Sequence, residues 1–214
     1  MAGRPREFDR DEALLRARDA FWARGYEGTS MSDLVSEMGI ASARIYAAFG
    51  SKEDLFREAV LLYEAREGGF ATRALAEEPT ARSAIERMMR EAAATYTRPG
   101  KPRGCMVVTA ATNIAKDNDP ILAWLTEHRR ARTASIVRRL EQAVVEGELA
   151  PDTDAQALGD LFAILMHGIS VQARDGVSEE RLLAVLPLAM DAFDRHAPAK
   201  KRGVVGASAV RRER

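Results

Sequence analysis

The stretch of sequence that decides the fold runs from Gly25 to Phe56 and reads GYEGTSMSDLVSEMGIASARIYAAFGSKEDLF. Ser30 with Asp33 three residues later is the pattern of a capping box, which begins a helix. Gly39 offers the left-handed backbone that ends a helix. A second short helix is expected directly afterwards, from Ala41 to Phe49. Two short helices joined by a tight turn are typical of a helix-turn-helix unit, which presents its second helix to the major groove of DNA.

Longer helices are expected on both sides of this pair. Before it, Asp9 with Glu12 resembles another capping box, and the apolar face that follows ends at Gly25. After it, Ser51 with Asp54 begins a helix that continues to about residue 66. The N-terminal quarter of the chain is therefore predicted to be a small helical unit.

The rest of the chain repeats the helical spacing of apolar residues, and alternating strand-like patterns longer than a few residues are absent. The fold class is therefore expected to be all-α. The expected helices span about residues 80–96, 105–116, 119–147, 155–173 and 178–196, with a loop at 98–104 and a kink at Pro187.

The composition is that of an ordinary globular protein. Hydrophobic residues make up 46% of the chain, and 32 basic residues balance 32 acidic ones, so net charge neither indicates nor excludes nucleic acid. The single cysteine, Cys105, cannot form an intrachain disulfide. No apolar run reaches the length of a membrane span, about 20 residues, and the first ten residues lack the apolar core of a secretory signal. We therefore expect a cytoplasmic protein with no membrane partner.

The residue patterns of common enzymes are not found. The sequence shows no glycine-rich phosphate loop, no nucleophile beside a base, and no metal-ligand spacing among His128, His167 and His196. We therefore expect no enzymatic activity, no metal site and no cofactor.

Several residues in and around the helix-turn-helix pair form a dense pattern: Gly25-Tyr26, Thr29, Leu34, Gly39-Ile40, Ile45-Tyr46, Phe49, Ser51-Lys52-Glu53 and Leu55-Phe56. On these residues, the stretch from Asp9 to about Tyr63 resembles the DNA-binding domain of the TetR family of bacterial transcription regulators. The resemblance implies an N-terminal three-helix helix-turn-helix domain, joined by a fourth helix to a larger helical ligand-binding and dimerisation domain. It also implies a homodimer that binds a double-stranded DNA operator and responds to a small-molecule effector.

This reading divides the chain into four parts. Residues 1–8 are expected to form a flexible basic arm, and 9–66 the helix-turn-helix DNA-binding domain with its linker helix. Residues 67–197 are expected to form the ligand-binding and dimerisation domain, and 198–214 a disordered basic tail.

Five residues are expected to contact DNA: Thr29, Ser42, Arg44, Tyr46 and Lys52. Arg44 is the expected base reader, because arginine forms a bidentate pair with O6 and N7 of guanine; a phosphate contact is the alternative. The hydroxyl groups and the ammonium suit phosphate oxygens. Helix capping for Thr29 and Ser42, and plain solvation for Lys52, are the alternatives.

The expected recognition helix departs from the usual pattern of the family, which begins with serine, lysine and glycine. Alanines stand at several of its positions, namely Ala41, Ala43, Ala47 and Ala48. Ala41 removes an N-cap side chain, and the others reduce the number of base contacts. Direct readout is therefore expected to be sparse, with thymine methyl groups packing on the alanines and Arg4, Arg6 and Arg10 adding minor-groove or backbone contacts.

A small apolar or amphipathic effector is expected among the central helices of the larger domain. The expected lining residues are Met89, Tyr96, Cys105, Thr109, Asn113, Trp124 and Met166. Plain core packing is the alternative for each of them, and Asn113 is the most informative because a buried amide needs a partner. Cys105 is either a reactive thiol, favoured by Lys101 and Arg103 just before it, or an inert small hydrophobe.

The last two long helices are expected to pair two subunits. The expected interface residues are Gly159, Phe162, Met166, Leu182, Leu186 and Phe193, with burial inside one subunit as the alternative. The predicted function is a TetR-like regulator, by family default a repressor, that binds a palindromic operator and is released by its effector. The alternative is a helical small-molecule-binding or scaffold protein with weakened DNA recognition.

Overall fold

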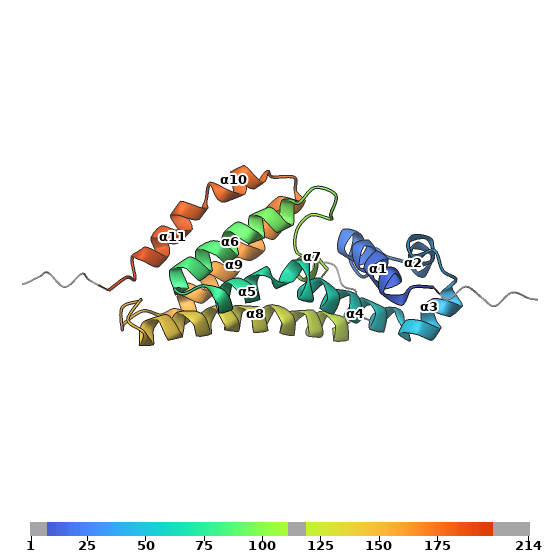
Figure 1. Cartoon of the computed structure of the whole chain (residues 1–214), viewed down its shortest axis with the longest axis horizontal. Coiled ribbons are helices and arrows are strands. Elements are labelled where there is room, and N and C mark those ends of the chain that lie inside the picture. Colours follow the sequence, from blue (N-terminus) through green and yellow to red (C-terminus); the bar gives the residue numbers. More distant parts are fainter. Residues whose placement is uncertain (1–7, 111–118, 199–214) are drawn as a thin grey trace, which may run out of the picture.

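The computed structural model describes residues 8–110 and 119–198, and these residues form helices and no strand (Figure 1). The prediction of an all-α fold is confirmed. The first four helices are α1 (Arg10–Arg24), α2 (Met31–Met38), α3 (Ser42–Phe49) and α4 (Lys52–Ala65). They correspond to the four helices expected around the helix-turn-helix pair.

Local capping explains where these helices begin. The Ser51 hydroxyl accepts the N–H of Asp54 at 3.0 Å, and the Asp54 carboxylate accepts the N–H of Ser51 at 3.0 Å, so the expected capping box is confirmed. Ser30 and Asp33 form the same arrangement at the start of α2. Gly39 ends α2 with a φ of 70°, in the left-handed region that favours glycine.

The capping box expected at the start of α1 is only half correct. The Asp9 carboxylate accepts the N–H groups of Asp11 and Glu12 at 2.9 and 3.1 Å, as an N-cap does. The Glu12 carboxylate, however, pairs with Arg16 one turn later at 2.8 Å. Asp9 therefore caps α1 by its own side chain.

The larger part of the molecule contains one short 3-10 helix and further α-helices. They are η1 (Glu67–Gly69), α5 (Phe70–Glu77), α6 (Ala81–Thr97), α7 (Met106–Thr109), α8 (Asp119–Val145), α9 (Ala155–Arg174), α10 (Glu179–Leu183) and α11 (Leu186–Asp194). The helices expected near 80–96, 119–147 and 155–173 are confirmed as α6, α8 and α9.

The helix α5 is missing from the sequence-based prediction. Two glycines, Gly68 and Gly69, precede it and suggest a break in helical structure. The structure gives Gly68 a packing role, because a Cβ atom at this position would lie 2.7 Å from the ring of Tyr63. Phe70 and Ala74 then bury one side of α5, so the helix depends on tertiary packing that the local pattern does not show.

The prediction of one kinked helix over residues 178–196 is wrong. α10 ends at Leu183 and α11 begins at Leu186. Pro187 has no N–H group, and its ring would clash with the carbonyl of Leu183 in a continuous helix. Pro187 therefore lies in the first turn of a new helix. Of the helix expected at 105–116, the structure describes α7, and residues 111–118 lie outside the described residues.

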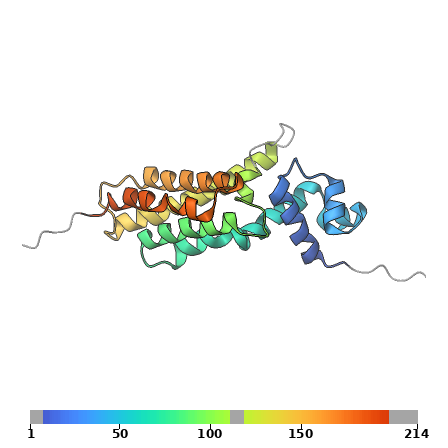
Figure 2. The ribbon, with the colours of Figure 1, turned by 90° about the horizontal axis from the view of Figure 1, so that it is seen from above.

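The arrangement of the helices is elongated. α1, α2 and α3 gather at one end of α4, and α4 leads to the larger bundle, where α8 runs lengthwise beneath α5 (Figure 1). The turned view shows α10 and α11 lying along the bundle (Figure 2), where they pack against α6. The buried core is one cluster that includes residues of both parts. Within it, the rings of Trp22 and Tyr63 meet at 4.8 Å between centroids.

Candidate nucleic-acid interface and sensor core

The second helix of the helix-turn-helix pair, α3, has one buried and one exposed face. Ile45 and Phe49 are buried in the core. The exposed side carries predicted DNA contacts, namely Ser42, Arg44 and Tyr46. Ala41 makes no side-chain cap bond, as expected, so no capping side chain covers the first N–H groups of α3. The structure therefore brings three predicted contacts together on one open surface, at a helix start that suits an anion.

Thr29 does not fit the phosphate contact expected of its side chain. It is fully buried, and its hydroxyl donates to the carbonyl oxygen of Gly25 at 2.7 Å. A buried hydroxyl that is already bonded closes the turn between α1 and α2 and does not reach solvent. Helix capping, the alternative for Thr29, is not seen either, because Ser30 is the N-cap of α2.

Lys52 begins α4 and is only half-buried. Its Nζ atom lies 4.2 Å from the centroid of the Tyr26 ring, a cation–π distance. Burial lowers the pKa of Lys52, and the carboxylates of Glu27 and Asp33 partly oppose this effect. The ammonium is thus held near the helix-turn-helix pair, and its contact with a phosphate stays a prediction.

Arg10 was expected to contact DNA together with Arg4 and Arg6, but in the structure its side chain is engaged within the protein. Its Nη2 atom contacts both carboxylate oxygens of Glu58 at 2.8 Å, and its guanidinium lies 4.4 Å from the ring centroid of Phe49. A weaker bond of 3.4 Å reaches the carbonyl oxygen of Ala48. Arg10 therefore ties the start of α1 to α3 and α4 and positions the recognition helix. Arg4 and Arg6 lie outside the described residues.

Two long-range hydrogen bonds fasten α1 to the larger bundle. The indole Nε1 of Trp22 donates to the carbonyl oxygen of Gly104 at 2.9 Å. Arg174, at the end of α9, donates to the carbonyl oxygen of Ala23 at 2.9 Å. These contacts join residues 82 and 151 positions apart, so no local pattern in the sequence could have indicated them.

A buried arginine adds to this junction. Arg18 is 2% exposed, and its guanidinium contacts Glu67 at 2.9 Å and Asp19 at 2.6 Å. Asp19 is also paired with Lys101 at 3.1 Å. These charges connect α1 with η1 and with the loop before α7.

The predicted effector-lining residues occupy several environments. Four of them are buried, namely Met89, Tyr96, Cys105 and Met166. Trp124 lies elsewhere on α8, with its ring 4.2 Å from that of His128 and beneath the guanidinium of Arg57. Thr109 lines a cavity of about 250 Å³ between α1 and α9. Asn113 lies outside the described residues.

The cation beside Cys105 is not one of the two predicted from the sequence. Lys101 is engaged by Asp19, whereas Arg132 of α8 places Nη1 3.7 Å from the Cys105 sulfur. The other terminal nitrogen of Arg132 lies 3.2 Å from the carboxylate of Glu64. The charge next to the thiol therefore comes from a residue 27 positions later in the chain.

The predicted dimer residues lie inside the protomer. Each of them is buried: Gly159, Phe162, Met166, Leu182, Leu186 and Phe193. A Cβ atom at Gly159 would lie 2.5 Å from the Val137 side chain, so this glycine permits close packing of α9 on α8. The prediction chose the inner faces of these helices, because apolar spacing does not reveal which partner a face meets. The alternative, burial within one subunit, holds for this set.

Other chemistry finds little support in the described residues. None of their His, Cys, Asp and Glu side chains form a group of three or more that could hold a metal ion. Among the helices of residues 8–110 and 119–198, none has the length and apolar character needed to cross a membrane.

A helix-turn-helix unit with an exposed second helix, joined through one long helix to a larger bundle, defines a class of DNA-binding regulators. Two family models match the chain. The model described as bacterial regulatory proteins, tetR family, matches residues 13–59, and the model described as tetracyclin repressor-like, C-terminal domain, matches residues 79–196. The chain belongs to the TetR family of bacterial regulatory proteins. This family consists of transcription regulators, not enzymes.

Individual relatives agree with this assignment. The HTH-type transcriptional repressor ComR of Escherichia coli (strain K12) is 33% identical over 187 residues, covering 86% of this chain and 88% of ComR. The repressor BdcR of the same organism is 28% identical over 194 residues, covering 90% and 93% of the two chains. A solved structure of a cysteine mutant of the TetR family regulator CifR, complexed with 26bp double-strand operator DNA, is 42% identical. It has a TM-score of 0.85 and covers 89% of this chain and 99% of CifR.

Proposed function

We propose that the protein is a homodimeric transcriptional repressor that binds a palindromic operator through α3 and is released by a small apolar or amphipathic effector. The observation that carries this proposal is the exposed face of α3, supported from below by the buried Ile45 and Phe49. The similar CifR structure contains operator DNA, and ComR and BdcR are repressors. These similarities support the same role for this chain. Because DNA is the proposed partner, we expect the protein to act in the cytoplasm.

The proposed contacts follow from the side chains on α3. Arg44 would pair with the O6 and N7 atoms of a guanine, while Ser42 and Tyr46 would bind phosphates on either side. Ala43 and Ala47 are also exposed and would pack on thymine methyl groups. Lys52 would add a phosphate contact from the start of α4. We therefore expect the preference for the operator sequence to depend mainly on one arginine per subunit.

We infer a functional division of the described chain into a reading head, residues 9–66, and a sensor domain, residues 67–197. The effector would bind in the sensor domain, and α4 would transmit its presence to the reading head. A ligand shifts the DNA equilibrium only by the difference of its affinities for the two arrangements, typically about 1–3 kcal/mol. The bonds from Trp22 to Gly104 and from Arg174 to Ala23 join the two parts and give the reading head a defined position that such a shift can change.

The proposed dimer surface lies on the outer faces of α9 and α11. Ile164 and Val171 on α9 and Leu188 on α11 are exposed, Ile164 by 66% and Leu188 by 71%. Gly168 lies between the two α9 residues at helical spacing, and a Cβ atom there would meet nothing within 4 Å. An exposed apolar stripe with a small residue at its centre favours close approach of a second helix. A second copy of this chain would cover it.

Two measurements test the proposal together. Solution scattering of the full chain should give the mass of a dimer, and a gel shift with DNA upstream of its own gene should show binding that random DNA does not compete away. A chain that binds small molecules in its sensor domain but no DNA would favour the alternative function, a ligand-binding or scaffold protein with weakened DNA recognition.

A further inference from the structure

The only cysteine of the chain is held in a fixed position between the reading head and the sensor bundle. Cys105 is fully buried, and its N–H donates to the hydroxyl of Ser170 on α9 at 2.8 Å. The preceding Gly104 has a φ of 79°, and a Cβ atom there would lie 2.8 Å from the carbonyl oxygen of Ser170. The backbone before the thiol therefore packs directly on α9 and has little room to move.

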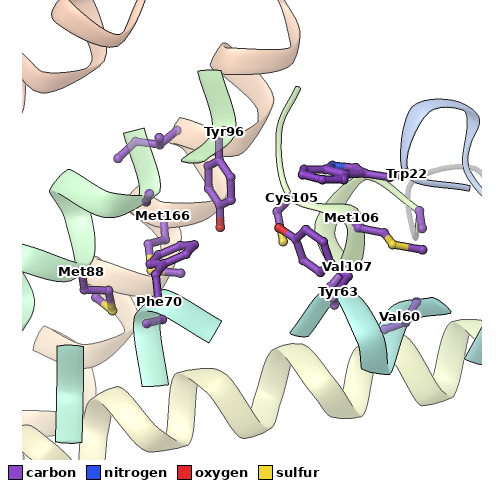
Figure 3. Packing of buried hydrophobic residues seen from close by; sticks show 14 of the residues in the cluster. Trp22, Val60, Tyr63, Phe70, Met88, Tyr96, Cys105, Met106, Val107 and Met166 are labelled. Atoms are coloured by element: carbon purple, nitrogen blue, oxygen red, sulfur yellow. The ribbon is translucent and has the colours of Figure 1, made fainter. Parts of the chain in front are cut away.

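Cys105 lies in the apolar core, but polar groups also approach its sulfur. Arg132 approaches it to 3.7 Å, and the ring of Tyr63 points its hydroxyl towards it (Figure 3). The Tyr63 hydroxyl is buried and has no hydrogen-bond partner of good geometry in the described part of the chain. A buried hydroxyl without a partner is unfavourable for folding alone, so its position beside the thiol calls for a partner that binds there.

The protonation of the neighbouring groups suits hydrogen-bond donation. Burial, and next the nearby thiol, raise the pKa of Tyr63 well above its ordinary value, and the same two effects act on Tyr96. Burial works to lower the pKa of Arg132, but the surrounding thiol, phenol and carboxyl groups outweigh it and raise the pKa. Tyr63, Tyr96 and Arg132 are therefore all donors at neutral pH.

A groove open to solvent is lined by one member of this cluster, Arg132. It encloses about 220 Å³ between the end of α4, α5 and α8, and its walls include Glu64, Gly68, His128 and Arg132. Arg132 is shared, since one nitrogen contacts Glu64 on the groove side and the other contacts the sulfur. Gly68 packs directly against the ring of Tyr63. The groove and the thiol are thus separated by the side chains of Arg132 and Tyr63.

We propose that Cys105 is a covalent modification site for small α,β-unsaturated carbonyl compounds that enter by this groove. The sulfur would attack the β-carbon, forming a C–S bond, while the π electrons of the C=C bond move to the carbonyl oxygen. Arg132 and Tyr63 would donate to the resulting enolate, and the proton lost by the thiol would end on the α-carbon. The net reaction adds S–H across the double bond, so no atom leaves and no oxidant is required.

The size and chemistry of the surroundings select this class of compound. A groove of about 220 Å³ admits only a small molecule. Cationic and phenolic donors stabilise an oxygen on which negative charge develops. When a thiol attacks an alkyl halide, no negative charge develops on an oxygen atom. The donors would therefore not accelerate that reaction in the same way.

The site also has a direct route to the reading head, and this part of the proposal rests on the proposed function. The carbonyl oxygen of Gly104, the residue just before the thiol, accepts the indole N–H of Trp22 on α1. An adduct on Cys105 would need space that the fully buried sulfur lacks. The chain at Gly104 would move, and the Trp22 bond that positions α1 would weaken.

The first experiment treats the full-length native chain with methyl vinyl ketone and follows adduct formation by intact-mass spectrometry, with Cys105→Ser as the baseline. We expect one adduct per chain at Cys105. Tyr63→Phe should slow its formation about a hundredfold without lowering the melting temperature, because the hydroxyl has no protein partner to lose. Arg132→Lys should slow it as well. Arg138→Lys, at an exposed position of the same helix, is the matched control and should react like the parent chain.

The outcomes separate the parts of the proposal. A native parent whose Cys105 stays unmodified while the urea-unfolded chain reacts overturns it, as does a rate that Tyr63→Phe leaves unchanged. Transmission is read from Trp22 fluorescence in a Trp124→Phe background: an adduct that leaves this emission unchanged overturns the route to α1. A chain that forms the adduct and shifts its emission, yet binds no DNA before or after, contradicts the proposed function and not the modification site.

Discussion

The reading head and the sensor domain are built from different kinds of information in the sequence. In the reading head, helix starts are set by residues three positions apart, such as Ser51 and Asp54. In the sensor domain, Thr80 and Ser83 form a local capping box at the start of α6, and Glu148 adds a distant contact there: its carboxylate accepts the N–H of Ala81 at 2.7 Å from 67 positions away. Local patterns therefore account for the helix starts of the reading head, whereas the start of α6 and the junction of the sensor domain with α1 also depend on distant contacts.

The largest expected effect tests whether the junction is as important as its burial suggests. Arg18→Ala removes a 2% exposed guanidinium and leaves the carboxylate of Glu67, itself mostly buried, without its partner. Breaking a buried pair in this way typically costs about 3–5 kcal/mol of unfolding free energy. Urea denaturation of the full chain measures this loss.

The matched control for this prediction lies half a turn away on the same helix. Arg16 pairs with Glu12 at 2.8 Å, but both side chains are more than half exposed. Arg16→Ala should change the unfolding free energy by no more than about 0.5 kcal/mol. Equal losses for the two variants would show that the contact between α1 and η1 has no special energetic role.

The next effect concerns what the reading head reads. Arg44→Ala should weaken binding to the specific operator by about 1–3 kcal/mol at one symmetric position and leave random DNA nearly unaffected. Lys52→Ala should weaken specific and random DNA alike and reduce the salt dependence, because a phosphate contact carries no sequence information. Gel shifts on both kinds of DNA at several salt concentrations make the comparison. If Arg44→Ala weakens both kinds of DNA equally, Arg44 contacts phosphate only.

These differences explain how far prediction from sequence could go. Capping boxes, the closing glycines and the apolar spacing of α3 are local, so the helix-turn-helix pair and its exposed face were predictable. The apolar pattern also located α9 and the terminal helical region, but it assigned Phe162 and Phe193 to a subunit interface, whereas both are buried within one chain. An apolar pattern shows that a helix face is buried, but it does not show which part of the molecule or which partner covers that face. For the same reason Arg132 could not be matched to Cys105 in advance.

A third prediction compares a local cap with a long-range one. Ser51→Ala removes the N-cap of α4 and should lower the unfolding free energy by about 1 kcal/mol. Glu148→Ala removes the acceptor of the N–H groups of Ala81 and Arg82, at 2.7 and 2.8 Å, and should cost a similar amount. Thermal denaturation compares the variants with the parent chain. A Glu148 variant as stable as the parent would mean that Thr80 caps α6 sufficiently alone.

The smallest expected effect is the response of the local caps to acid. Hydrogen bonds from the side chain and then the backbone of Ser30 lower the pKa of Asp33, and those from Ser51 lower the pKa of Asp54 in the same way. A carboxyl group with a lowered pKa in the folded state binds its proton more readily when unfolded. Its stabilising contribution is therefore complete above the unfolded pKa, about 4, and is lost as the pH falls through the folded value.

The experiment measures the midpoint of urea unfolding between pH 7 and pH 3. The midpoint of the parent chain should fall as the solution becomes acidic, and it should fall less steeply in the Asp33→Asn, Asp54→Asn double variant. Since both carboxylates are exposed, the difference should be small and should shrink at high salt. An identical acid slope in the parent and the double variant would show that the caps of the reading head act through geometry and not through charge.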